Sequence, residues 1–240
     1  MKAQERHHLK ENDFAINLKR AVEAAGSNSR NLLMGAGAFV LVVAIGSAYF
    51  YSKRHSANVA GEMLGVAMAI ENAPIAPPSS LPGAQQQAGT YPTEKAKQEA
   101  LLAAYQKVAS TYPSAPAGIA ANYHAAAVLL AMGRFDEAQT AYKAVTASAG
   151  TSIYGTMAQL GAAQAQAGAG KYDDAIKGLT DLAAQRDGAM PVDGVLMELA
   201  RTSLKAGKVQ EARAAFKRVV DEFPSSAYVT DARQQIAALN

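Results

Sequence analysis

Four histidines are the residues of this chain best suited to acid–base or metal chemistry, and their spacing fits neither role. His7, His8 and His55 flank an apolar segment without the spacing of metal ligands. His124 stands alone in a segment of helical periodicity, where packing or solvent exposure accounts for it. The chain has no cysteine, so the sequence offers no thiolate nucleophile, disulfide or thiolate metal site.

Patterns that bind phosphate or activate a nucleophile are missing as well. The glycine-rich stretch AGAGK, at 167–171, is not followed by the Ser or Thr of a phosphate-binding loop, and GAGAF, at 35–39, lies inside the apolar segment. Asp173 and Asp174 begin a helical segment, where the helix dipole favours carboxylates. The sequence therefore predicts a protein that is not an enzyme and that holds no cofactor and no metal.

A repeated pattern of residues runs through the second half of the chain. The stretch GRFDEAQTAYKAV begins at Gly133, and a step of 37 residues from its aromatic Tyr142 leads to side chains of similar character. Four columns keep this step: Tyr105, Tyr142, Leu179 and Phe216; Leu101, Ala138, Ala175 and Ala212; Val108, Val145, Leu182 and Val219; and Gly133, Gly170 and Gly207. A fixed period of this length indicates a repeat array.

Each repeat reads as two helices joined by a turn. First helices are expected at 116–132, 156–167 and 195–206, and second helices begin near Asp136, Asp173 and Gln210. A glycine column closes each first helix, because a left-handed residue there carries no Cβ penalty. Alanines are expected where the two helices cross closely: Ala126, Ala163 and Ala200.

This pattern of glycine, aromatic, alanine, aromatic and proline resembles the tetratricopeptide repeat, whose units are usually about 34 residues long. The likeness covers about residues 94–240 and predicts an all-α, helix–turn–helix solenoid. Unit three departs from the motif, with Leu179 in the aromatic column, and no unit has the tryptophan that often opens it.

The resemblance implies a concave groove lined by the first helices. By the register of the motif, this groove would present seven residues: Tyr123, Ala127, Met157, Gln164, Met197, Arg201 and Lys205. Such a surface is apolar with a positive end, and it fits an extended or helical peptide segment. The alternative is a solvated inner face that binds nothing.

Residues 32–51 carry no charge and form one apolar run long enough to span a bilayer as a helix. Tyr49, Phe50 and Tyr51 stand where an aromatic belt would lie. An uncleaved signal anchor is the favoured interpretation, because the preceding segment of about 31 residues is longer than a usual signal n-region. A cleaved signal peptide is the alternative, since Gly46-Ser47-Ala48 offers a cleavage site.

Positive charges around this segment predict its orientation. The net charge of +3 comes from this region, because six basic residues precede the run, two follow it closely, and the rest of the chain is nearly neutral. We therefore expect a cytoplasmic tail at 1–31, with a short amphipathic helix on Phe14, Leu18 and Val22 or loose order instead. In a bacterium the span would lie in the inner membrane, with the repeats in the periplasm. Nucleic acid is excluded as a partner, because no basic stripe remains.

Two segments connect the span to the repeats. A helix at 52–72 continues past the membrane and would pack on 94–110 as the first helix of unit one. Residues 73–93 hold five of the nine prolines, so an irregular linker is expected, either a flexible spacer or a strap that binds a partner. A polar last helix at 225–239 would cap the stack.

The whole layout, together with the phrases STYP at 110–113 and EFPSS at 222–226, resembles the YfgM-like ancillary subunits of the Sec translocon. This resemblance implies a membrane-anchored scaffold or adaptor whose extracytoplasmic repeats bind protein partners at a translocon or chaperone complex. The alternative function is a permanent accessory subunit of a large membrane assembly, such as a respiratory or photosynthetic complex.

Overall fold

The structure is a computed structural model that describes residues 20, 29–77, 86–185 and 189–239. These residues form helices and no strands, so the predicted all-α solenoid is confirmed. The chain divides into two compact units, Met1–His55 and Ser56–Asn240, which are described separately. The helix predicted on Phe14, Leu18 and Val22 lies outside the described residues.

One long helix, α2 at Ser29–Glu71, begins in the first unit and ends in the second. It contains both the uncharged run 32–51 and the predicted segment 52–72, without a break at their boundary. Large apolar side chains of its first part are exposed, such as Phe39 at 69% and Tyr51 at 76%. Among the described residues, α2 is the helix long and apolar enough to cross a membrane.

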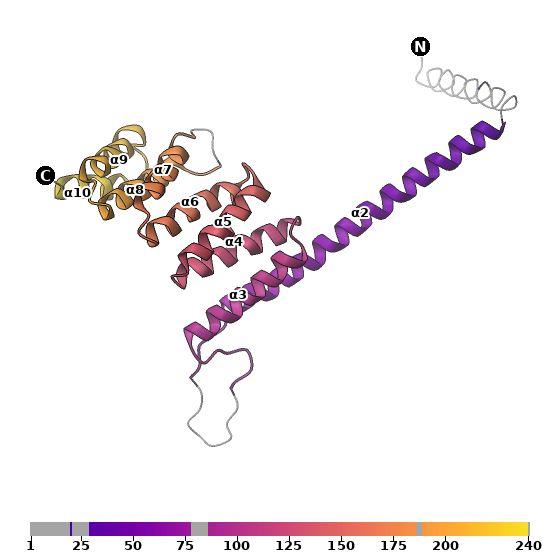
Figure 1. Ribbon diagram of the computed structural model, residues 1–240, viewed down its shortest axis with the longest axis horizontal. Coiled ribbons are helices and arrows are strands. Elements are labelled where there is room, and N and C mark those ends of the chain that lie inside the picture. Colours follow the sequence, from indigo (N-terminus) through magenta and orange to yellow (C-terminus); the bar gives the residue numbers. More distant parts are fainter. Residues whose placement is uncertain (1–19, 21–28, 78–85, 186–188, 240) are drawn as a thin grey trace, which may run out of the picture. The chain divides into compact units, whose positions relative to one another are not determined.

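The second unit stacks helices in pairs, as Figure 1 shows from α3 to α10. The helices are α3 Glu94–Thr111, α4 Pro116–Ala131, α5 Phe135–Ala149, α6 Ile153–Gly168, α7 Tyr172–Ala183, α8 Val192–Lys205, α9 Val209–Glu222 and α10 Val229–Ala238. Consecutive helices pack against one another along this order. Their starts follow from local chemistry: the Thr93 hydroxyl accepts the Ala96 N–H, and Pro116 occupies a first-turn position of α4.

The apolar columns of the sequence form the interior of this stack. Tyr105, Tyr142, Leu179 and Phe216 are each at most 2% exposed, and the alanines of the neighbouring column are fully buried. Two buried clusters result, one from α2 to α6 and one from α6 to α10. The period of 37 residues is therefore the spacing of interior contacts, as predicted.

The three turns inside the repeats share one backbone geometry. Gly133, Gly170 and Gly207 have φ angles of 73°, 77° and 75°, the left-handed region expected of them. After each glycine the next N–H donates back to a carbonyl five residues earlier, as from Arg134 to Leu129 at 2.9 Å. This bond satisfies a carbonyl that the end of the helix would otherwise leave without a partner.

The same turns carry a repeated ion pair. Lys171 Nζ lies 2.7 Å from Asp136, and Lys208 Nζ lies 2.8 Å from Asp173, so one pair follows the other by the period of the repeat. The pKa of each lysine is raised chiefly because the aspartate accepts a hydrogen bond from it. These pairs are exposed and therefore screened by solvent, so each contributes little to the free energy of unfolding.

The last part of α2 serves as the first helix of unit one. Ala67 is fully buried in the same cluster as Leu101 and Tyr105, and Met63, Leu64 and Ile70 pack against that cluster. The Tyr105 hydroxyl donates to Glu71 at 3.1 Å. This hydrogen bond joins the end of α2 to α3.

The proline-rich linker is tied together at its base. The Tyr91 N–H donates to Pro74 O at 3.1 Å, and the Ala76 N–H donates to Tyr91 O at 2.9 Å. Gln86 Nε2 donates to Ala76 O at 2.8 Å and so adds a side-chain clasp. The two ends of the linker are therefore held together by hydrogen bonds, which a flexible spacer would not need.

A glycine in α6 makes room for the aromatic column. A Cβ added to Gly161 would lie 2.3 Å from Cζ of Tyr142, whereas one added to Gly178, in α7, would meet nothing closer than Ala163 Cβ at 3.9 Å. We expect Gly161→Ala to lower the free energy of unfolding by about 1–3 kcal/mol, because a buried ring must move.

Gly178→Ala is the matched control for this prediction. It should raise stability by about 0.5–1 kcal/mol, because alanine is the better helix former at an exposed position. Urea unfolding of both full-length variants in detergent, followed by near-ultraviolet circular dichroism, makes the comparison. Equal stability of the two variants would show that Tyr142 is not packed against Gly161.

Candidate functional site

Three of the seven predicted groove residues line one cavity. Gln164 of α6 and Met197 and Arg201 of α8 surround a hollow of about 400 Å³, which we call the C-terminal cavity. Its other lining residues are Leu160, Met190, Pro191, Asp193, Gly194, Val195, Glu198 and Tyr228. The hollow is within the size range of ligand pockets.

The floor and walls of the C-terminal cavity are mainly apolar. Met197 is only 1% exposed, so it forms the floor instead of projecting from the surface. Leu160 comes from the neighbouring α6, and Tyr228, which is 41% exposed, stands at the turn before α10. Gly194 leaves the space beside Tyr228 open, because an added Cβ there would meet the ring only at 3.7 Å.

The charges around this cavity differ from the expected positive end. Arg201 forms an ion pair with Asp231 of α10 at 2.9 Å, so its charge is compensated. Asp193 accepts a hydrogen bond from Ser226 Oγ at 2.6 Å, a neutral donor that leaves the carboxylate charge in place. Lys205 is exposed on α8 and does not line the cavity. The rim is therefore acidic.

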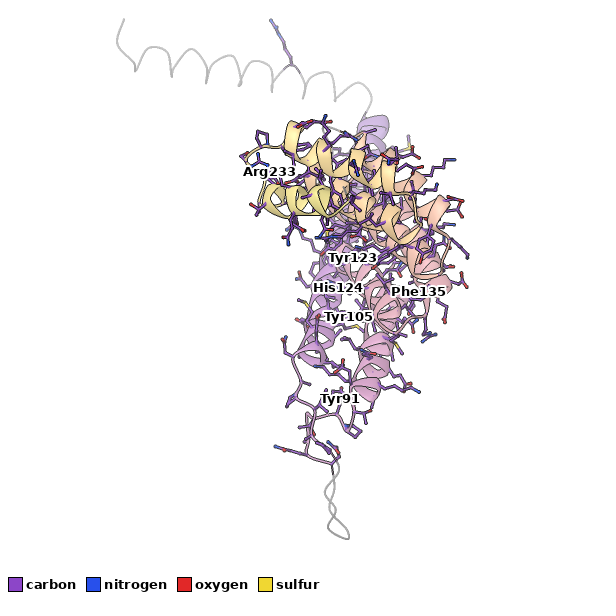
Figure 2. The ribbon with its side chains drawn as sticks, turned by 90° about the vertical axis from the view of Figure 1, so that its left-hand side faces the viewer. Tyr91, Tyr105, Tyr123, His124, Phe135 and Arg233 are labelled. Carbon is purple, nitrogen blue, oxygen red and sulfur yellow. The ribbon has the colours of Figure 1, made fainter. Side chains whose placement is uncertain are left out.

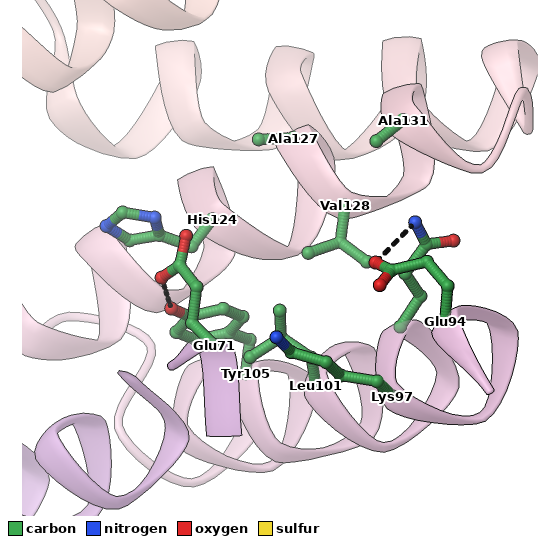
Figure 3. Close-up of a pocket in the computed structure, with 10 residues that line it drawn as sticks. Glu71, Glu94, Lys97, Leu101, Tyr105, His124, Ala127, Val128 and Ala131 are labelled. Carbon is green, nitrogen blue, oxygen red and sulfur yellow. Dashed lines mark hydrogen bonds between the residues drawn. The ribbon is translucent and has the colours of Figure 1, made fainter. Parts of the chain in front are cut away.

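A second hollow, the N-terminal cavity, lies between α3 and α4 and has a volume of about 250 Å³ (Figure 3). The predicted groove residue Ala127 lines it, together with the apolar Leu101 and Val128. Glu71 and Tyr105 close one end through their hydrogen bond, and Glu94 stands at the other end. Glu71 is the contribution of α2 to this lining, and the other lining residues belong to α3 and α4.

His124 takes part in packing, as its isolated position indicated. Its ring stacks on Tyr105 with the centroids 5.1 Å apart, and the two lie together in Figure 2. Tyr123, a predicted groove residue, is half-buried beside it and packs on Tyr142 at 5.8 Å and on Tyr154 at 5.7 Å. These contacts make one aromatic cluster across four helices.

Burial sets the protonation of this cluster. Desolvation raises the pKa of Tyr105 and of Tyr142 well above the ordinary tyrosine value, and the neighbouring Glu71 adds to the effect on Tyr105. The pKa of Tyr123 is raised for the same main reason. All three hydroxyls therefore stay neutral at physiological pH, which suits packing and hydrogen bonding.

The remaining predicted residue, Met157, is half-buried on α6 and lines neither cavity. Three residues that line the C-terminal cavity without having been predicted lie just before α8 or α10: Met190, Pro191 and Tyr228. Tyr228 is one: two steps of 37 residues lead to it from Tyr154, with Pro191 between them. The recurrence of Tyr154, Pro191 and Tyr228 at steps of 37 residues could have indicated this position. Asp193 and Glu198 carry no such repeat.

The part of the chain that the structure describes contains no group of three or more acidic or histidine side chains placed to hold a metal ion. The two cavities are lined by carboxylates, one histidine and two tyrosines. Glu71, Tyr105, Asp193 and His124 are engaged in hydrogen bonds or ring stacking. The chemistry that the arrangement offers is recognition of an apolar and charged surface.

Comparisons with known proteins agree with this fold. A model of the tetratricopeptide repeat family matches residues 123–191 and 160–227, so this part of the chain is similar to that family. A solved structure of nearly identical TPR-like repeats from a putative kinesin light chain of Podosopora anserina is 17% identical, with a TM-score of 0.52, over 61% of this chain and 79% of that one.

A variant of the same fungal protein is 19% identical, with a TM-score of 0.52, over 61% of this chain and 78% of that one. At this identity the likeness shows the fold alone. No curated protein sequence gives a significant match.

The raised tyrosine pKa values predict a loss of stability in alkali. A group whose pKa is higher in the folded state stabilises the fold fully below its unfolded pKa of about 10, and this contribution falls as the pH rises above that value. We expect the free energy of unfolding to fall more steeply between about pH 9.5 and pH 11 in the natural protein than in a Tyr105→Phe/Tyr142→Phe variant.

Denaturant unfolding at a series of pH values measures both slopes. Lysine ion pairs titrate in the same range, so the difference between the two proteins is the informative quantity. Identical slopes would show that neither hydroxyl is desolvated.

Proposed function

We propose that this protein is a non-catalytic, membrane-anchored scaffold or adaptor. Its helical repeats would bind a segment of a partner protein at a membrane complex of the translocon or chaperone type. The observation that carries the proposal is the C-terminal cavity: an open, apolar hollow on the first-helix face of tetratricopeptide repeats, with charged groups on its rim. Repeat domains of this kind generally act as protein-interaction scaffolds, and the resemblance in layout to translocon subunits supports the choice of complex.

Membrane anchoring is the second part of the proposal. The run 32–51 of α2 is apolar and uncharged, and its large apolar side chains from Met34 on are exposed, which in water would be costly and in lipid is favourable. With six basic residues before the run and two after it, the N-terminal tail at 1–31 would lie in the cytoplasm of a bacterium. The span at 32–51 would then cross the inner membrane, and residues 94–240 would be periplasmic.

The cavity gives a direct test of partner binding. Gly194→Leu should fill the space beside Tyr228 and cut the amount of co-purified partner about tenfold or more, because a loss of about 1.4 kcal/mol already corresponds to tenfold in affinity. Gly194→Ala is the control, since its Cβ would sit at ordinary contact distance from the ring. Affinity purification in mild detergent with quantitative mass spectrometry reads out both variants.

Retention of every partner by Gly194→Leu would contradict the role of the cavity. If the retained partners are stoichiometric and resist salt, the protein is instead a permanent accessory subunit, held by other surfaces. Substoichiometric translocon or chaperone proteins that disappear with Gly194→Leu support the adaptor.

Anchoring is tested within the apolar run. Leu41→Arg combined with Ile45→Arg places two charges at the centre of the span, each costing about 2.5–3.5 kcal/mol there. We expect this variant to leave the membrane fraction on carbonate extraction, while Val66→Arg, a control at an exposed site further along α2, stays in it. Intact mass shows whether the natural chain is cleaved after Ala48, which would contradict an anchor.

A further inference from the structure

The C-terminal cavity carries an electrostatic imbalance on its rim. Asp193 and Glu198 stand on α8 at the cavity, whereas the cation that lines it, Arg201, is already paired with Asp231. Within the described ranges Glu198 makes no ion pair. Within 189–239, the described range that contains α8, the hollow thus combines an apolar interior with two carboxylates that form no ion pair with a cation.

The carboxylates are also held in place. Asp193 is fixed by the Ser226 hydroxyl and by its hydrogen bond from the Gly194 N–H at 2.9 Å. Glu198 follows Asp193 by five residues on the same helix, so both project from one rigid element, and Glu198 is half-buried. A positioned carboxylate loses little side-chain entropy when it meets a cation.

We infer that the C-terminal cavity binds a partner segment in which a large apolar side chain is flanked by lysine or arginine. This inference rests on the proposed function and specifies the chemistry of the partner. The apolar side chain would enter between Leu160, Val195 and Met197, and the cation would reach Glu198 and Asp193 on the rim. Burial of the apolar group supplies affinity, and the charge pairing supplies selectivity and speeds association.

Charge complementarity argues against an acidic segment here. An aspartate or glutamate beside the apolar group would face two like charges across a half-buried rim, and the charge of Arg201 is already compensated by Asp231. Lys205 stands two turns beyond Glu198 on α8, so it does not offset the rim. The selectivity is therefore built from repulsion as well as attraction.

Matched peptides test the inference on the full-length protein in detergent. The probes are three fluorescein-labelled peptides of equal length in a Gly-Ser background, carrying Leu-Lys, Leu-Glu or Ser-Lys pairs. We expect the Leu-Lys peptide to bind up to about fivefold more tightly than either other peptide, since one exposed ion pair contributes up to about 1 kcal/mol. Fluorescence anisotropy measures each affinity, at low and at high salt.

A charge reversal provides the decisive comparison. Glu198→Lys should invert the preference, so that the Leu-Glu peptide becomes the tighter ligand. Asp181→Lys makes the same change of charge on an exposed position of α7, outside the cavity, and should leave the preference as it is. Circular dichroism confirms that both variants remain folded.

Several results would overturn the inference, and they separate it from the proposed function. Equal or weaker binding of the Leu-Lys peptide, no binding of any peptide, or an unchanged preference in Glu198→Lys refutes the assignment of a basic partner. If Gly194→Leu still removes the natural partner in that case, the groove function stands. If the Leu-Lys peptide binds Gly194→Leu normally, the cavity is not the site and both proposals fall.

Discussion

The fold depends on close contact between a large side chain of each second helix and small residues of its neighbours. Tyr142 shows this most clearly: its ring lies against Gly161 of the next unit, where even one methyl group would collide with it. Ala126, Ala163 and Ala200 are almost fully buried at the crossings within units. Interiors are packed at crystal-like density, so such contacts define both the distance and the angle between helices.

The candidate site is a consequence of this stacking. When second helices pack between successive pairs, the first helices are left to line one face, and hollows form where their side chains are short or absent. The C-terminal cavity opens beside Gly194, and the N-terminal cavity opens over Ala127. Affinity and selectivity then come from residues that the packing itself does not require, such as Glu198 and Tyr228.

The two units of the chain differ in how far their large apolar side chains are exposed. Among the described residues of Ser56–Asn240, most large apolar side chains are buried or half-buried, whereas in Met1–His55 those of α2 are exposed along the described run. A sequence that is apolar all round a helix has no face for water, which is why a bilayer is the natural environment proposed for it. The acidic rim of the C-terminal cavity lies in the unit that packs as a water-soluble protein does.

The sequence by itself determined the helical repeats, their period, the glycines of their turns and the interior columns, because each depends on local conformation or on a recurring contact. Tyr105, Tyr142 and Phe216 could be placed in the core from their spacing alone. The sequence also predicted that Gln164 and Arg201 share one face, since register decides which way a helical residue points, and both line the C-terminal cavity.

The tertiary structure decided which side chains of that face are available to a ligand and which charges remain uncompensated. The sequence predicted Arg201 as a free cation, but in the fold it pairs with Asp231 of α10, which lies 30 residues later in the chain. Met197 was predicted to project into the groove, but it is buried and forms the floor of the cavity. The hydrogen bonds between Tyr91 and residues 74–76 likewise join segments that the repeat does not relate. Pairings of this kind depend on which side chains meet after the chain has folded. The repeat period of a sequence does not predict them.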